Sequence, residues 1–185
     1  MSTFPLTFLE VQAKNHALLS TIGFLILLPF GVLVARYART FTPVWFPVHA
    51  AFQLLFSGPV IFAGWYYGHR TATLMGLPHF NDPHEKTGLA LLILYVIQLV
   101  LGLFTHFVKL PSPFGAGTRS PQNYFHVFLG LVILVVAAEQ VHRGLYIEWI
   151  IGTGNLHPIP DSAKKAWLAL VVVRDAYDKC FVMYH

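Results

Sequence analysis

Charged side chains are scarce in this sequence of 185 residues. Asp, Glu, Lys and Arg together make up only 11% of the chain, whereas soluble domains carry about 25%. Hydrophobic residues reach 56%, and the mean hydropathy is +0.60. This shortage of charge excludes an ordinary soluble domain and predicts a protein that crosses a membrane.

Cysteine is almost absent as well, because Cys180 is the only one. An internal disulfide and a cysteine-based metal centre are therefore excluded. The formal net charge of +4 does not indicate a nucleic-acid partner, because the basic residues stand between apolar stretches. Membrane lipid with anionic headgroups, or an anionic substrate, explains them better.

Four uncharged stretches are long enough to span a bilayer, which takes about 20 apolar residues in a helix. They cover residues 15–35, 40–69, 87–108 and 120–138. Pro29 and Pro59 fall inside the first two stretches, and we expect them to kink these helices without ending them. Residues 1–15 form an N-terminal segment, 16–149 the transmembrane domain, and 150–185 a loop with a short amphipathic or truncated helix. Arg174 and Asp175 limit that last helix.

Four histidines stand at or near the start of the four stretches, namely His16, His49, His84 and His126. Successive helices in a bilayer run in opposite directions. His16 and His84 should therefore meet on the side of the N-terminus (side A), and His49 and His126 on the other (side B). Two imidazoles on facing helices can hold one six-coordinate haem iron. The predicted fold class is an all-α membrane protein, a four-helix transmembrane bundle with two haems and a short C-terminal helix.

Three further histidines lie at the far ends of the helices. At about 100° per residue, His69 and His142 should face away from the bundle, whereas His106 should point inward near the side B haem. One turn after His84 and His126 stand Gly88 and Gly130. Each leaves room for a flat macrocycle, although small residues also serve plain helix packing in membranes.

Side B also carries a cluster of basic residues without an acid, and its members are Arg36, Arg39, Lys109 and Arg119. A positive-inside topology explains this cluster. So does a docking site for an anionic electron donor and for the haem propionates. The charges at all helix ends are balanced between the two faces, so charge alone leaves the orientation open.

With these residues in place, the chain resembles the cytochrome b561 family, in particular the transmembrane module that fungi attach to a DOMON haem domain. The similar stretches are HALLSTIGFLILLPFGVLVARYAR, WFPVHAAFQ, DPHEKTG and RSPQNYFHVFLGLVIL, within residues 16–149. The resemblance implies two b-type haems held by His16 with His84 and by His49 with His126. It also implies a cytosolic ARYAR end, and hence a non-cytosolic N-terminus in a multi-pass protein of the plasma membrane or an endomembrane.

The function that the resemblance implies is electron transfer from cytosolic ascorbate, or a similar small reductant, to an acceptor on the other side. The acceptor would be a ferric chelate, monodehydroascorbate or a partner haem domain, which would make the protein a transmembrane ferric reductase. No DOMON domain precedes the first helix, so a haem-bearing anchor that relays electrons for a separate redox protein is the alternative. A histidine-based metal or proton transporter is a third, weaker hypothesis, because the midplane offers mainly Gln53, Ser57 and Gln98. The pattern leaves room for a homodimer.

Overall fold

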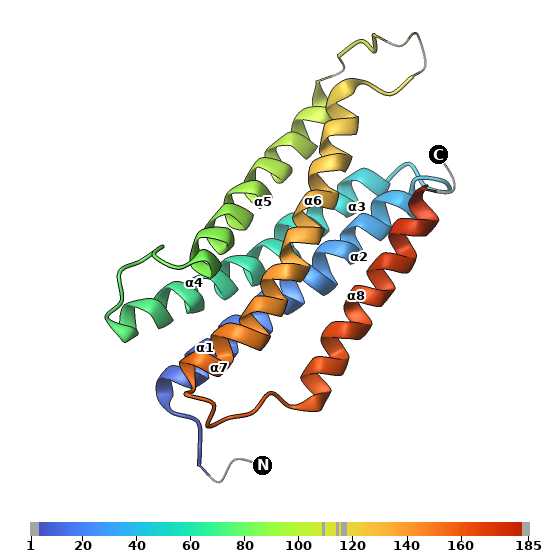
Figure 1. Cartoon of the computed structure of the whole chain (residues 1–185). Coiled ribbons are helices and arrows are strands. Elements are labelled where there is room, and N and C mark those ends of the chain that lie inside the picture. Colours follow the sequence, from blue (N-terminus) through green and yellow to red (C-terminus); the bar gives the residue numbers. More distant parts are fainter. Residues whose placement is uncertain (1–3, 109, 114, 116–117, 183–185) are drawn as a thin grey trace.

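A computed structural model describes residues 4–108, 110–113, 115 and 118–182, and every regular element in these residues is helical. Four long, apolar spans run antiparallel in a bundle (Figure 1). The first covers Phe8–Ala38, as α1 (Phe8–Thr21), η1 (Ile22–Leu27), α2 (Leu28–Leu33) and η2 (Val34–Ala38). The second covers Trp45–Met75, as α3 (Trp45–Phe52), η3 (Gln53–Ser57) and α4 (Gly58–Met75). The third is α5 (Pro83–Phe107). The fourth covers Pro121–Gly152, as α6 (Pro121–Arg143), η4 (Gly144–Glu148) and α7 (Trp149–Gly152). The predicted all-α fold with four transmembrane helices is confirmed.

The first two spans continue through their prolines, as the sequence predicts. Pro29 and Pro59 each follow a π-helical segment, η1 and η3 respectively. A proline has no N–H, so it cannot complete the bond to the carbonyl four residues earlier. A π turn closes its hydrogen bonds five residues apart, and it therefore absorbs the missing bond without ending the span.

The ends of the helices are set by local capping. Thr7 and Glu10 form a reciprocal capping box, which starts α1 at Phe8, before the first uncharged stretch of the sequence. Asp82 accepts the backbone N–H of His84 at 2.7 Å and that of Glu85 at 3.0 Å, which starts α5. Such caps satisfy backbone donors that a helix start leaves free. His84 consequently lies in the first turn of its helix.

The core lies at mid-length of the bundle and is mostly apolar. Its largest fully buried side chains include Ile61, Leu91, Tyr95 and Ile133, each at most 2% exposed. The Tyr95 hydroxyl donates to the carbonyl oxygen of Gln53 at 2.7 Å. This layer separates the two ends of the bundle, where the four histidines lie.

A fifth helix, α8 (Asp161–Val182), follows the bundle. Its 22 residues span about 33 Å. The helix confirms the predicted C-terminal helix, and it runs alongside the bundle (Figure 1). Trp167 explains the direction, because its indole N–H donates to the carbonyl oxygen of Ala138 at 3.3 Å and its ring packs on the core.

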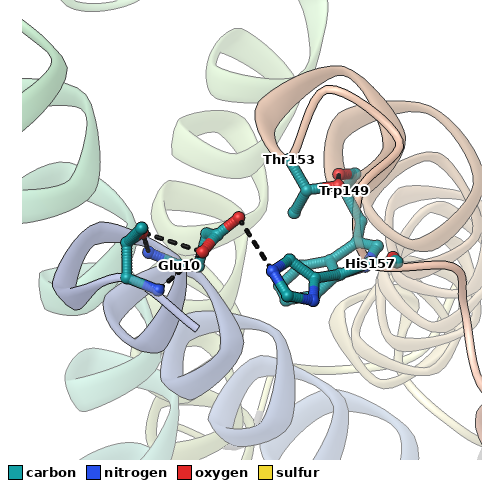
Figure 2. A network of polar contacts seen from close by, with 5 residues as sticks. Glu10, Trp149, Thr153 and His157 are labelled. Carbon is teal, nitrogen blue, oxygen red and sulfur yellow. Dashed lines mark hydrogen bonds and ion pairs between the residues drawn. The ribbon is translucent and has the colours of Figure 1, made fainter. Parts of the chain in front are cut away.

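A polar network joins the first turn of α1 to the segment before α8. The carboxylate of Glu10 points toward His157, with Oε1 and Nε2 3.6 Å apart (Figure 2). The indole of Trp149 donates to the carbonyl oxygen of His157 at 2.7 Å, and the Thr153 hydroxyl donates to that of Trp149 at 2.8 Å. Glu10 and His157 are both buried. This network holds the start and the end of the bundle together on side A.

Candidate functional site

The structure brings His16 and His84 together on side A. Their ring centroids lie 6.0 Å apart and their planes make an angle of 83°. A bond from an imidazole nitrogen to a transition metal is about 2 Å long, so rings that bind one ion from opposite sides have centroids about 6 Å apart. The pair from α1 and α5 therefore has the spacing of two axial ligands.

On side B, His49 of α3 and His126 of α6 line one cavity of about 570 Å³. Sites for cofactors and other small molecules have volumes of about 300–1,000 Å³. Much of the remaining lining is apolar, with Leu99, Leu103 and Leu131 among its members. The cavity can therefore enclose a large, flat and mostly apolar group between the two imidazoles.

One imidazole of each pair is held by a backbone carbonyl of a neighbouring helix. Nδ1 of His16 donates to the carbonyl oxygen of Gly64 at 2.8 Å, and Nδ1 of His49 donates to that of Gly31 at 2.7 Å. A metal-bound histidine characteristically donates its other ring N–H in this way. Nε2 of both residues would thereby be left to bind a metal.

These two bonds also show how far the side A histidines lie from the side B histidines along the bundle. His16 lies level with Gly64, which is 64−49 = 15 residues beyond His49. His49 lies level with Gly31, which is 31−16 = 15 residues beyond His16. Fifteen residues of helix rise about 22 Å, so the two layers lie near opposite faces of a membrane about 30 Å thick.

Three of the four basic residues predicted on side B belong to the wall of the cavity. Arg36, Arg39 and Arg119 all belong to its lining. Partial burial, together with the charges of Arg119 and Arg36, lowers the pKa of the Arg39 guanidinium from its ordinary value. Lys109, the fourth basic residue predicted here, lies outside the described residues. Three like charges along one cavity attract an anion.

The sequence profile of the family described as eukaryotic cytochrome b561 matches residues 15–151. The chain belongs to this family. Its members bind b-type haem, and membership implies transmembrane electron transfer through haem.

Curated relatives extend well beyond the length of this chain. A cytochrome b561 and DOMON domain-containing protein of Arabidopsis thaliana is 27% identical over 157 residues, which is 78% of this chain and 36% of the relative. Another protein of that description and organism is 28% identical over 170 residues, or 89% of this chain and 38% of the relative. The chain thus spans little more than a third of the length of these relatives. No solved structure matches it.

The residues present fit a b-type haem. In the described part of the chain, no three His, Cys, Asp or Glu side chains come together to hold a bare metal ion. Two imidazoles per site suit a haem iron, because the macrocycle supplies the other four nitrogens. In each pair the second imidazole, of His84 or His126, has a buried Nδ1 without a partner among the described residues. A hydrogen bond from Nδ1 fixes the rings of His16 and His49. The rings of His84 and His126 lack such a bond among the described residues.

Glycines that the sequence analysis missed lie against the imidazoles. A Cβ added to Gly68 would lie 2.7 Å from Nδ1 of His16. One added to Gly102 would lie 3.0 Å from Cε1 of His126, and one added to Gly144 would lie 3.2 Å from Cε1 of His84. Three of the four rings therefore occupy space that a larger residue would fill.

The two glycines that the sequence singled out have a different neighbour. A Cβ added to Gly130 would lie 2.9 Å from Nε2 of Gln98, and one added to Gly88 would lie 3.5 Å from Nε2 of Gln140. Gly130 also lines the side B cavity. Both glycines thus accommodate the amide of a glutamine. That they also leave room for a macrocycle remains a prediction.

The rival histidines lie outside the two pairs. His69 is exposed and stacks on His79, with ring centroids 4.1 Å apart. His142 packs between Tyr146 and Trp167 at centroid distances of 4.6 and 5.0 Å. His106 lines the side B cavity and stacks on Phe46 at 3.4 Å. The structure thus places His106 in the lining of the side B cavity, whereas His69 and His142 pack on other aromatic rings.

Proposed function

We propose that this chain carries electrons across a membrane through two b-type haems. His16 and His84 would hold one on side A, and His49 and His126 the other on side B. The observation that supports this most directly is the presence of two histidine pairs at opposite ends of one bundle. Haem iron supplies reversible one-electron chemistry, and imidazoles in both axial positions favour electron transfer over oxygen activation.

The residues between the two sites suit this role. A layer of buried aliphatic side chains, including Ile61, Leu91 and Ile133, fills much of the middle of the bundle, where the polar residues Gln53 and Ser57 are also buried. Such mostly apolar surroundings, together with the four imidazoles, would set the reduction potentials of bound haems. A transporter of protons or metal ions would instead need polar groups through the midplane, so this layer opposes that hypothesis.

Electrons would enter on side B from a small anionic reductant such as ascorbate. Arg36, Arg39 and Arg119 line the side B cavity, where they would attract the donor and pair with the haem propionates. Side B would then be cytosolic and the N-terminus non-cytosolic. The acceptor on side A would be a ferric chelate, monodehydroascorbate or a partner haem domain.

A second function has support of its own. The relatives combine cytochrome b561 with a DOMON domain, as their descriptions state. The chain could therefore serve as a haem-bearing anchor that relays electrons for a separate partner protein. Direct reduction of the purified chain by ascorbate would support the first function, whereas reduction only in the presence of a redox partner would support the second.

The test of the proposal is a count of haems. A reduced spectrum and a pyridine haemochrome assay of the purified protein should give two haem b per chain. His16→Ala and His84→Ala should each remove the same haem, and His49→Ala and His126→Ala the other. Loss of the same haem from His16→Ala and His49→Ala would contradict the pairing, and a chain without haem would overturn the proposal.

A further inference from the structure

Two glutamines bind the backbone of two of the four candidate ligands. Nε2 of Gln98 donates to the carbonyl oxygen of His126 at 2.7 Å, and Nε2 of Gln140 makes the same bond to His84. Gln98 lies on α5, whose own histidine, His84, belongs to side A. Gln140 lies on α6, whose own histidine, His126, belongs to side B. The two helices therefore hold each other crosswise.

A repeated pattern produces this arrangement. His84, Gly88, Gln98 and Gly102 follow the spacing His-x3-Gly-x9-Gln-x3-Gly. The same spacing recurs 42 residues later as His126, Gly130, Gln140 and Gly144. In each copy the first glycine accommodates the glutamine of the other helix, and the second accommodates the other helix's imidazole. Because α5 and α6 are antiparallel, one pattern builds the same contact at both ends of the bundle.

Each of these contacts leaves one donor and one acceptor unused. Oε1 of Gln98 and Nδ1 of His126 are both buried without a partner in the described part of the chain. The same holds for Oε1 of Gln140 and Nδ1 of His84. A buried polar group without a partner costs about 1–3 kcal/mol. In each site the two unused atoms are complementary, because an imidazole with Nε2 on a metal carries its proton on Nδ1.

We infer that Gln98 and Gln140 are positioning residues for His126 and His84, respectively. The amide nitrogen fixes the backbone of the ligand, as seen in the structure. In the haem-bound protein the amide oxygen accepts the Nδ1–H of the same histidine, directly or through one water. The glutamines thus do for these two ligands what the carbonyl oxygens of Gly64 and Gly31 do for His16 and His49. This inference rests on the proposed function, because it requires haem on all four histidines.

The inference predicts opposite shifts in potential for two substitutions of one residue. An acceptor on Nδ1–H makes the imidazole a stronger donor to iron, which favours the ferric state. Gln98→Met removes the acceptor and should raise the midpoint potential of the side B haem. Gln98→Glu supplies a stronger, charged acceptor and should lower it. A tenfold change in the ratio of ferric to ferrous affinity corresponds to 59 mV for one electron.

The experiment is a spectroelectrochemical titration of the full chain in detergent or nanodiscs, with haem content measured in parallel. Gln140→Met and Gln140→Glu are the matched controls, since they should move the side A haem and leave side B unchanged. The haems are assigned from the single-histidine variants. If a methionine variant fails to bind haem, the glutamate variant of the same residue decides by the sign of its shift.

The outcomes separate the two proposals. Opposite shifts confined to the haem whose histidine the substituted glutamine contacts would support the positioning role. A merely structural disturbance has no reason to reverse sign between methionine and glutamate. Two haems per chain with potentials indifferent to both glutamines, or shifts of equal sign in both haems, would overturn the inference alone. Absence of haem from the unaltered chain would overturn the proposed function and this inference with it.

Discussion

The contact between Gly68 and His16 allows a sharp test of the side A site. An alanine Cβ at position 68 would lie 2.7 Å from Nδ1 and 2.8 Å from Cε1 of the imidazole, whereas ordinary contacts are about 3.5–4.0 Å. The ring would have to move by roughly 0.8 Å, beyond the tolerance of about 0.5 Å for a functional ligand. The 2.8 Å bond from His16 to Gly64 would be strained or lost.

We expect Gly68→Ala to weaken retention of the side A haem by about 10–100-fold, as is typical when the support of a metal ligand is removed. The side B haem should be unaffected. Pyridine haemochrome assays and redox titration after dilution or detergent challenge would measure the loss. Gly152→Ala is the control, because its Cβ would meet no described heavy atom within 4 Å.

The effect of Gly68→Ala on stability should reverse when the imidazole of His16 is removed. Gly68 lies inside α4, where alanine is favoured over glycine by about 1 kcal/mol on helix propensity alone. In a His16→Ala background, Gly68→Ala should therefore raise the melting temperature. Retention of two haems with unchanged potentials in Gly68→Ala, or destabilisation in the double variant, would refute this account of the site.

Three further predictions concern residues around the two sites. His69→Ala should keep both haems, because His69 is exposed and stacks on His79; loss of a haem equivalent would show that the second span turns it inward. His106→Ala should also keep both haems but shift the potential of the side B haem in a redox titration, since His106 lines the side B cavity. An unchanged potential would show that His106 does not influence that haem. Replacing Arg36 and Arg39 with Gln should slow reduction by ascorbate from side B at unchanged haem content. Added salt should slow it as well, because exposed charges are screened over about 8–10 Å, and stopped-flow rates indifferent to both changes would place the donor site elsewhere.

The sequence predicts the architecture well because bilayer thickness constrains it. A shortage of charge and four long apolar stretches are sufficient to predict four spans. Helix ends are less predictable. The capping box of Thr7 and Glu10 starts α1 within a charged segment, and the contacts of Trp167 align α8 with the bundle. Both depend on side-chain contacts that hydropathy does not record.

Topology alone predicts that His16 lies near His84 and that His49 and His126 share one end of the bundle, but it does not predict the hydrogen bonds around these histidines. The bonds to Gly64 and Gly31 are made to carbonyl oxygens, which every residue carries, so no residue type marks them. Gln98 and Gln140 are marked by a repeat that is visible in the sequence. Its period of 42 residues corresponds to neither a helical turn nor a short repeat, and its meaning depends on the antiparallel contact of α5 and α6.

The crosswise contact of α5 and α6 also fixes the distance between the two ends of the bundle. On each helix a histidine serves one face and a glutamine, 14 residues away (98−84 and 140−126), serves the other. This interval corresponds to about 21 Å of rise. Insertion of one residue between the histidine and the glutamine of one helix would add about 1.5 Å and turn everything beyond it by about 100°, so the two glutamine–histidine contacts could no longer form together. In the proposed two-haem arrangement, the gap that an electron would cross is therefore set by an integer number of residues, and it could change only in steps that restore the helical phase.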